Sequence, residues 1–223
     1  MLNLVDSAMA TLRARSVELM PYVEPARAKR AIDVFGSVLG LIVLAPVMLL
    51  VALAVRVSSR GPIIFAQERC GLGGRRFRFY KFRTMIDGAQ DQRAALDHLN
   101  EMTGPVFKIA RDPRITRVGA ILRKTSLDEL PQLWNVLRGE MSLVGPRPPM
   151  PDEVADYDLR QLGRLSVVPG ITGLWQVSGR STINDFETWL ALDLEYVRRW
   201  SLWLDFRILA KTVVVVISAR GAQ

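Results

Sequence analysis

Two adjacent carboxylates, Asp128 and Glu129, are the residues of this chain best suited to chemistry. Arginines flank them in the sequence, with Arg123 before the pair and Arg147 after it. The 223 residues include one histidine and one cysteine, too few for a Ser-His-Asp arrangement, a Cys-His pair or a His-rich metal cage. A carboxylate pair among arginines can bind an anionic phosphate group and attack it. If the chain is an enzyme, carboxylate oxygens and arginines carry out its chemistry.

Phosphate chemistry assigns a role to each of these groups. A carboxylate nucleophile can attack phosphorus to give an acyl phosphate, which divides one difficult transfer into two easier ones. Because a carboxylate and a diphosphate repel each other, the attack needs a cation, and Mg²⁺ typically binds one or two carboxylates together with substrate phosphates. Asp128 and Glu129 are therefore the candidate Mg²⁺ ligands. Arg123 and Arg147 are candidate forked donors to the phosphate oxygens.

The residues around the pair allow two local structures. If Asp128 caps a helix, Pro131 falls at the third helical position, where its missing N–H costs nothing, and Asp128 lies at the positive end of the helix dipole. Alternatively, Ser126 and Glu129 form a capping box and Glu129 is purely structural. The second arrangement places Pro131 at the fifth helical position, where a backbone hydrogen bond is lost. We therefore favour the first.

The composition indicates a soluble part joined to a part that lies in lipid. Hydrophobic residues make up 49% of the chain, charged residues make up 23%, and the net charge is +8. The positive charge indicates an anionic partner: nucleic acid, anionic membrane lipids or a phosphorylated substrate. No nucleic acid is expected, because no helix-turn-helix, zinc-finger or RNA-recognition signature is present. The single cysteine excludes an internal disulfide and is compatible with a reducing cytosolic face.

An uncharged segment from Val34 to Val55 is long enough to cross a membrane. Pro46 lies in its middle, and an interior proline breaks or kinks a helix. Each half, of about 12 residues, then extends roughly 18 Å, close to one leaflet of a hydrocarbon core about 30 Å thick. Basic residues, which favour the cytoplasmic side, flank both ends: Arg27, Lys29 and Arg30 before the segment, and Arg56, Arg60 and Arg69 after it. A re-entrant hairpin satisfies both flanks and is favoured over a kinked spanning helix.

The remaining pattern predicts a mostly helical α+β fold, in a monotopic membrane protein. We expect a surface lead-in over residues 1–28, a re-entrant membrane helix-hairpin over 29–58, and a cytosolic catalytic domain with amphipathic interfacial helices over 59–223. Pro62–Met85 is typical of a β-hairpin, and Lys81 and Arg83 on its return strand are candidate substrate contacts. Helices are expected at 87–98, 152–163, from an N-cap at Asn184 to 199, and at 201–218, with a loop at 169–181. The tryptophans at 189, 200 and 203 suit either the membrane interface or an ordinary core.

Several long motifs, in order, resemble the bacterial sugar transferases, the monotopic polyprenyl-phosphate phosphoglycosyl transferases. The resemblance runs from about Lys29 to Ala219. It includes KRAIDVFGS, LAPVMLL, FAQERCGLGGRRFRFYKFRTM, DPRITRVGAILRKTSLDELPQLWNVLRGEMSLVGPRP and PGITGLWQVSGR. The sequence has no large N-terminal region, so it is similar to the small, exopolysaccharide-initiating form of the family.

The resemblance implies a membrane helix broken near Pro46 and an active site that faces the cytoplasm at the bacterial inner membrane. Ala45 stands where some members have a serine, so the bend would depend on the proline. Asp128 would attack the β-phosphate of a UDP-sugar and release UMP, and polyprenyl (undecaprenyl) phosphate would then take the phosphosugar. Glu129 would bind the metal or act as a general base. The phosphate contacts would be Arg123 and Arg147, and the nucleotide or sugar contacts would be Gln176 and Arg180.

Two other functions remain compatible with the sequence. One is a transferase that moves only the sugar and releases UDP, and the other is a non-enzymatic membrane anchor of a polysaccharide assembly complex. The sequence does not identify the sugar. A homo-oligomer is compatible with it, but the number of subunits is not determined.

Overall fold

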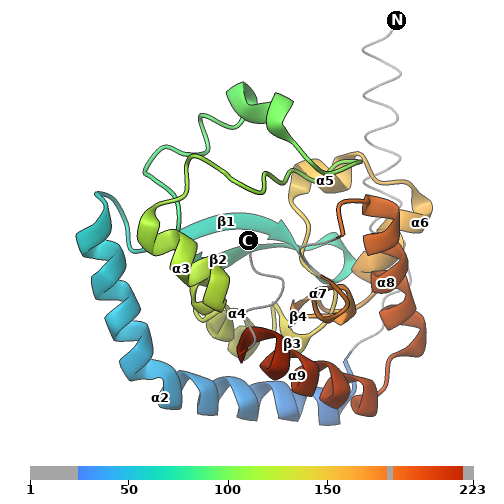
Figure 1. The fold of residues 1–223 in the computed structure, drawn as a ribbon. Coiled ribbons are helices and arrows are strands. Elements are labelled where there is room, and N and C mark those ends of the chain that lie inside the picture. The colour runs from blue at the N-terminus through green and yellow to red at the C-terminus, as the bar shows by residue number, and fades with distance from the viewer. Residues whose placement is uncertain (1–24, 180–182, 218–223) are drawn as a thin grey trace, which may run out of the picture.

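A computed structural model of the chain describes residues 25–179 and 183–217. The predicted α+β, mostly helical class is confirmed, with one long helix and two small sheets (Figure 1). The helices are α2 (Arg27–Ser58), α3 (Arg117–Thr125), α4 (Gln132–Arg138), α5 (Pro151–Ala155), α6 (Leu159–Leu162), α7 (Leu174–Val177), α8 (Phe186–Arg199) and α9 (Leu202–Ile217). The strands are β1 (Ile64–Cys70), β2 (Arg76–Phe82), β3 (Ser142–Val144) and β4 (Gly170–Thr172). Short 3₁₀ helices cover Leu72–Gly74, Ala94–Leu99, Leu127–Glu129 and Gly163–Ser166.

The N-terminal part of helix α2 turns a polar side toward the protein and an apolar side away from it. Lys29, Asp33 and Ser37 follow one another at four-residue spacing and are all buried. On the other side, Phe35 and Ile42 are 71% and 68% exposed. A contiguous apolar surface of this kind marks an interaction site rather than a water-facing surface. Together with the length and composition of α2, this pattern indicates that the protein associates with a membrane.

Helix α2 has two arms that run along two sides of the rest of the chain (Figure 1). Its hydrogen-bonded course continues from Arg27 to Ser58, with Pro46 inside it, so the proline accompanies a bend rather than a break. The first arm packs against α4 and β3, and Gly40 leaves room for the side chain of Leu133, 3.1 Å from where a Cβ would lie. On the second arm, Val51 and Val55 pack into a hydrophobic cluster with Phe82 and Leu122.

The basic residues that precede the apolar segment bind the protein. The Lys29 ammonium donates to Asp205 Oδ2 at 2.7 Å and to the carbonyl oxygen of Val144 at 3.0 Å. Arg30 donates to the last carbonyls of α4, those of Val136 and Leu137. Both cations therefore bind protein groups, and their use as charges that mark the cytoplasmic side stays a prediction.

The β-hairpin is confirmed and is longer than its apolar residues alone indicate. Strands β1 and β2 pair antiparallel from Ile64↔Phe82 to Cys70↔Arg76. Gly73 and Gly74 form the turn with positive φ values of 59° and 75°, a conformation that costs glycine little. Lys81 and Phe82 lie next to each other in β2, with Phe82 in the cluster under α2 and Lys81 on the opposite face of the strand.

A second, parallel strand pair was not predicted. Strand β3 pairs with β4 through Ser142↔Gly170 and Val144↔Thr172. Strand β4 lies within the segment 169–181, which was expected to be a loop. The backbones here lie so close that a Cβ on Gly170 would fall 2.0 Å from the nitrogen of Gly145. The glycines of the GPRP and PGITG motifs therefore allow this contact, which holds the loop after β3 in place.

Three further predictions need correction. Residues 87–98 form turns and a short 3₁₀ helix over Ala94–Leu99 instead of an α-helix. Helix α8 begins after an N-cap at Asp185, one residue beyond Asn184, and it is not an interfacial helix, because Trp189 and its apolar neighbours are buried. Helix α9 does expose apolar residues, with Trp203 71% exposed. Most of the expected lead-in over residues 1–28 lies outside the described residues.

The close approach of β3 and β4 predicts a large penalty for a side chain at Gly170. We expect Gly170→Ala to lower the free energy of unfolding by about 3 kcal/mol or more, because a backbone atom cannot move aside. This corresponds to a fall of about 6–12 °C in the Tm, measured by tryptophan fluorescence in detergent. The matched control is Gly163→Ala, where φ is −53° and the nearest atom is the end of the Leu194 side chain. It should change stability by less than about 1 kcal/mol, and equal effects of the two variants would contradict this account.

Candidate active site

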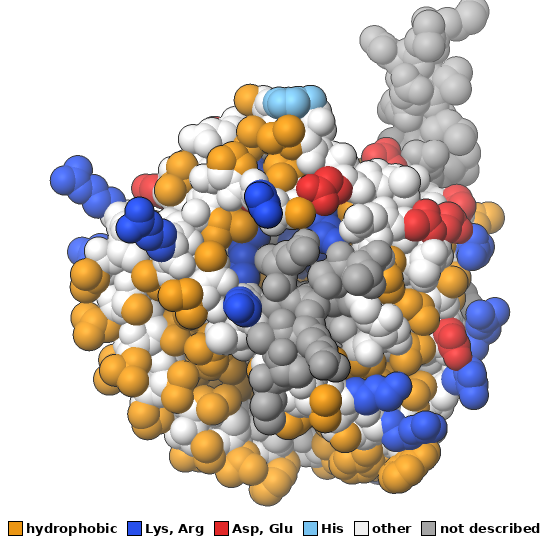
Figure 2. All heavy atoms as spheres, in the orientation of Figure 1, with side chains coloured by type: hydrophobic (Ala, Val, Ile, Leu, Met, Phe, Trp, Pro, Cys, Tyr) orange, Lys and Arg blue, Asp and Glu red, His pale blue; other side chains and the backbone are white. Residues whose placement is uncertain are grey.

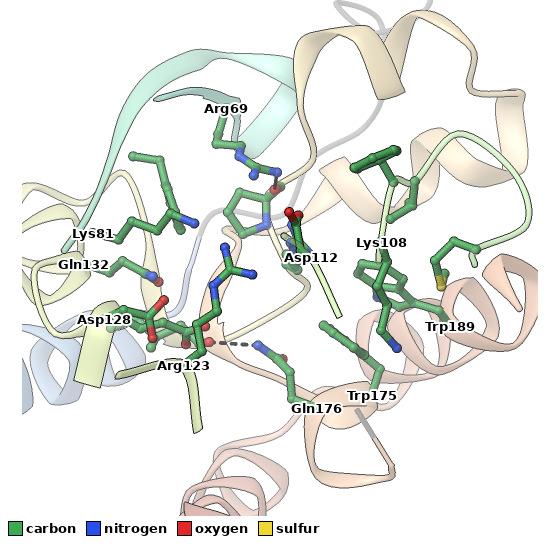
Figure 3. Close-up of a pocket in the computed structure, with 18 of the residues that line it drawn as sticks. Arg69, Lys81, Lys108, Asp112, Arg123, Asp128, Gln132, Trp175, Gln176 and Trp189 are labelled. Atoms are coloured by element: carbon green, nitrogen blue, oxygen red, sulfur yellow. Dashed lines mark hydrogen bonds between the residues drawn. The ribbon is translucent and has the colours of Figure 1, made fainter. Parts of the chain in front are cut away.

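Most of the predicted site residues line one cavity of about 260 Å³. Figure 2 shows Lys and Arg side chains inside a recess near the centre of the face viewed, and Figure 3 shows Lys81, Arg123 and Asp128 directed into the same space. The predicted residues that line the cavity are Lys81, Arg123, Asp128, Glu129, Arg147 and Gln176. Residues as far as 95 positions apart in the chain, Lys81 and Gln176, thus line one site.

Asp128 lies in a tight turn between two helices. Helix α3 ends at Ser126, whose φ of 56° is left-handed, and Leu127–Glu129 then form a 3₁₀ turn. Leu127 and Leu130 pack into the cluster under α2. The carboxylates between them line the cavity. Asp128 is buried, with 6% of the residue exposed.

Both predicted capping arrangements at this turn are wrong. Helix α4 begins at Gln132 with Pro131 as its N-cap, so Asp128 precedes the helix by four residues. Ser126 makes no capping hydrogen bond through its side chain, so there is no Ser126–Glu129 capping box. The proline lies at the helix boundary, where its missing N–H costs nothing. Asp128 therefore does not lie at the positive end of the α4 dipole, and the cations Lys81, Arg123 and Arg147 line the same cavity.

Each cation of the cavity is held by contacts with the protein. The Arg123 Nε donates to Thr84 Oγ1 at 3.0 Å. The Arg147 guanidinium lies 5.5 Å from the ring centre of Trp189, a cation–π distance. Arg69, which the sequence analysis did not single out as a site residue, donates to the Pro148 carbonyl oxygen at 3.1 Å and to Gln67 Oε1 at 2.8 Å. Groups held in this way need little reorganisation to bind an anion.

Burial and mutual repulsion disfavour the charged forms of two cations of the cavity. Desolvation and the nearby Arg123 lower the pKa of Lys81 to about 8. Desolvation and the nearby Arg147 also lower the pKa of Arg69. Positive charges that repel one another in a recess are stabilised by a multiply charged anion, which restores the pKa of each. The site is therefore suited electrostatically to a diphosphate.

Aromatic side chains form another part of the cavity wall. The rings of Trp175 and Trp189 stack with centroids 4.2 Å apart, and Phe107 and Ile183 also line the cavity. The indole Nε1 of Trp175 and the Oε1 of Gln176 are buried and have no hydrogen-bond partner among the described residues. These atoms are a donor and an acceptor available to a ligand. Sequence reasoning identified Gln176 here but missed the tryptophan pair, whose residues lie on α7 and α8.

Of the other predicted contacts, Arg83 does not line the cavity. Arg83 donates instead to the backbone and hydroxyl oxygens of Ser59 at 2.8 and 3.0 Å, and so holds the end of α2. Arg180 lies outside the described residues. Asp112 and Arg114, from the connector with sequence DPRITR, do line the cavity and were not predicted. Their buried ion pair of 2.6 Å engages the Asp112 carboxylate.

The two carboxylates of the cavity could hold Mg²⁺ only together with oxygen atoms of a bound substrate. Within residues 25–179 and 183–217, no three or more His, Cys, Asp or Glu side chains form a group that could hold a metal. Two carboxylates lining a cationic cavity match the way Mg²⁺ is bound at nucleotide sites, through one or two carboxylates plus phosphate oxygens and water. Asp128 and Glu129 would supply these protein oxygens.

Known proteins are similar in sequence to most of this chain. Residues 25–219 match the profile of the bacterial sugar transferase family. The galactosyl transferase CpsE of Streptococcus agalactiae is 49% identical over 88% of this chain and 43% of its own length. The exopolysaccharide production protein ExoY of Rhizobium meliloti is 42% identical over 87% and 88%. The undecaprenyl-phosphate galactose phosphotransferase of Salmonella typhimurium is 44% identical over 87% and 41%.

The relatives differ in length, and each of them matches most of this chain. The chain spans less than half the length of the Streptococcus and Salmonella proteins and most of the Rhizobium protein. The match includes the cavity residues, the β-hairpin and the apolar helix α2. The predicted family is thereby confirmed: this chain belongs to the bacterial sugar transferases.

Proposed function

We propose that this chain transfers a sugar 1-phosphate from a UDP-sugar to polyprenyl phosphate, with Asp128 as a covalent nucleophile and UMP as the leaving group. The observation that carries the proposal is a buried Asp128 carboxylate on the wall of a cavity lined by Lys81, Arg123 and Arg147. The names of the relatives support the reaction class, since the Salmonella protein is an undecaprenyl-phosphate galactose phosphotransferase. The product would begin the synthesis of an exopolysaccharide or another glycoconjugate.

In the first step an oxygen of Asp128 attacks the β-phosphorus of the UDP-sugar. The bond between that phosphorus and the bridging oxygen breaks, and UMP leaves with the electron pair of that oxygen. The β-phosphate then carries the sugar and the aspartyl group. The cations of the cavity stabilise the charge on the non-bridging oxygens during the transfer.

In the second step an oxygen of polyprenyl phosphate attacks the same phosphorus. The bond from phosphorus to the Asp128 oxygen breaks, the carboxylate is regenerated, and the product is a polyprenyl diphosphate sugar. Any proton on the attacking phosphate oxygen must leave. Glu129 lines the cavity beside Asp128 and is placed to accept it or to help hold the metal.

The other nucleophiles of the chain are unsuited to the reaction. Burial raises the pKa of the Cys70 thiol to about 11, so the thiolate is scarce at neutral pH. His98 is exposed in the 3₁₀ helix Ala94–Leu99 and does not line the cavity.

When bound by Asp128 and Glu129, Mg²⁺ would neutralise the repulsion between the carboxylates and the diphosphate.

We place α2 in the cytoplasmic leaflet of the bacterial inner membrane as a re-entrant helix, with the cavity facing the cytoplasm. Both arms support this arrangement, because Lys29 on the first and Val55 on the second pack against the same charged domain. A straight spanning helix would carry one end to the far side of the membrane. Arg27, Arg56 and Arg60 near the ends of α2 would contact anionic lipid headgroups.

Replacing the nucleophile tests the covalent step. Asp128→Asn keeps the size of the side chain but should reduce UMP release from UDP-sugars at least about 10³-fold, measured in nanodiscs with polyprenyl phosphate. Labelled UDP-sugar should leave a phosphosugar on Asp128 of the wild type when the acceptor is omitted. The control Asp91→Asn changes an exposed aspartate outside the cavity and should match the wild type. Release of UDP, or full activity of Asp128→Asn, would contradict the proposal and favour a UDP-releasing transferase or a non-enzymatic anchor.

Removal of the metal tests the role of the two carboxylates. Chelation with EDTA should abolish UMP release, and added Mg²⁺ should restore it. Because the protein supplies only two candidate ligands, Mg²⁺ should bind the protein alone weakly and should bind more tightly in the presence of UDP-sugar, as calorimetry can measure. UMP release that continues at full rate in EDTA would exclude this role.

The lowered pKa of Lys81 predicts a pH dependence of donor binding. The ammonium is charged below its pKa of about 8 and loses its charge as the pH rises through that value. The KM for the UDP-sugar should therefore rise about tenfold for each pH unit above 8. Lys81→Arg, which stays charged, should remove this rise between pH 8 and 9. A KM that rises equally in the variant would assign the dependence to another group.

A further inference from the structure

A second cavity, of about 330 Å³, lies beside the active site and is lined mainly by apolar side chains. It lies between α2, α4, α7 and α9, and Figure 1 shows α4 and the end of α9 close together above α2. Its apolar lining residues include Leu44, Leu130, Leu133, Val177, Val215 and Val216. We call this cavity the apolar groove. Its volume falls in the range of small-molecule sites, and its mainly apolar lining favours an apolar ligand group.

The apolar groove and the active-site cavity share a wall. Glu129, Ile171 and Gln176 line both. The Gln176 side-chain amide donates to the carbonyl oxygen of Ile171 at 2.9 Å, which fixes this wall. A ligand lying in the groove would therefore reach the active site beside Glu129, the carboxylate next to the nucleophile.

The other end of the groove leads to the apolar outer surface. Val216, on its wall, is 38% exposed, and its neighbour Val214 is 65% exposed. Hydrophobic side chains cover the lower part of the face shown in Figure 2, where Figure 1 places α2 and α9. The hydroxyls of Thr172 and Thr212 are 2.8 Å apart and tie β4 to α9 along the groove. The surface indicated for membrane contact is thus continuous with the groove, and the groove with the active site.

We propose that the apolar groove binds the first isoprene units of the polyprenyl phosphate acceptor and delivers its phosphate to the active site past Glu129. This inference rests on the proposed function. The acceptor has an anionic head joined to a long hydrocarbon chain, and a cationic cavity joined to an apolar groove matches both parts. The UDP-sugar has no apolar chain and cannot fill the groove. The groove thus separates the two substrates, with the donor on the cationic and aromatic side and the acceptor on the membrane side.

Photo-crosslinking tests the occupant directly and needs no turnover. A polyprenyl phosphate that carries a diazirine in its second isoprene unit is added at low mole fraction to nanodiscs of ordinary phospholipid, with Asp128→Asn protein. Mass spectrometry should locate the label on α4 or on α9 near Val215 and Val216. Labelling confined to the outer face of α2, around Phe35 and Ile42, would overturn the proposal. So would equal labelling of the groove by a diazirine phosphatidylglycerol at the same mole fraction, since the occupant would then be an ordinary acyl chain.

A variant that narrows the groove tests its contribution to catalysis. Val216→Trp adds bulk at a partly exposed position, so the fold should tolerate it, and the KM for polyprenyl phosphate should rise about tenfold or more. The release of UMP in a single turnover without acceptor should stay within about twofold of the wild type. Val214→Trp is the matched control, since it lies on the same helix but does not line the groove, and its KM should not change. An unchanged KM in Val216→Trp would overturn the proposal.

The two experiments separate failure of the groove from failure of the proposed function. If no UMP is released without acceptor, the covalent mechanism fails, whereas crosslinking in the groove would still identify the lipid site. If UMP is released normally but the label lies elsewhere, the groove assignment fails and the mechanism stands.

Discussion

The buried ion pair between Lys29 and Asp205 joins the membrane helix to the active site. The Lys29 ammonium also donates to the carbonyl oxygen of Val144, the last residue of β3. Gly145, Pro146 and Arg147 follow directly, so the loop that carries a cavity cation begins at this contact. Loss of one partner of a buried pair leaves an uncompensated charge and costs about 3–5 kcal/mol. The position of α2 and the position of Arg147 are therefore coupled.

The same network explains the inverted polarity of α2. Asp33, one turn after Lys29, accepts hydrogen bonds from the Ser142 hydroxyl at 3.0 Å and from the Leu143 backbone at 2.9 Å. Polar groups on one stripe thus fix the helix to β3, and the remaining sides are free to be apolar. In a water-soluble protein the stripe toward the core is the apolar one. The exposed apolar residues of α2 and α9 are suited to contact with lipid on the other sides.

Local signals in the sequence predicted the parts of the fold that depend on local structure. The glycines at 71, 73 and 74 between apolar strands predicted the hairpin. The charge-free run with Pro46 predicted a re-entrant helix-hairpin, and the structure has one continuous helix with Pro46 inside it. The pairing of β3 with β4 was missed because two strands of three residues, 28 positions apart, carry no periodic pattern. Lys29 and Arg30 were interpreted by charge alone, although their buried partners lie more than 100 positions away.

In the candidate site, too, some features were predicted from the sequence and others were missed. The carboxylate pair and its arginines were identified by residue type, and they do share a cavity. Arg69, Trp175 and Trp189 were missed as site residues because nothing in their local sequence distinguishes them from strand or core residues. The local structure at Asp128 was predicted wrongly because Pro131 is equally acceptable as an N-cap and at the third helical position. Residue chemistry was therefore a better guide to the site than helix boundaries were.

Burial of Asp128 would have a consequence for the acyl phosphate that we propose at this residue. Such a group is vulnerable to water, and hydrolysis would waste the donor. With 6% of Asp128 exposed, bulk water has little access to it, which protects a reactive intermediate. An acceptor that arrives through the proposed apolar groove would approach the same phosphorus from the membrane side, whereas the donor would enter through the cavity that faces the cytoplasm. The placement of the nucleophile at the junction of a cationic cavity and an apolar groove would thus favour attack by a lipid phosphate over attack by water.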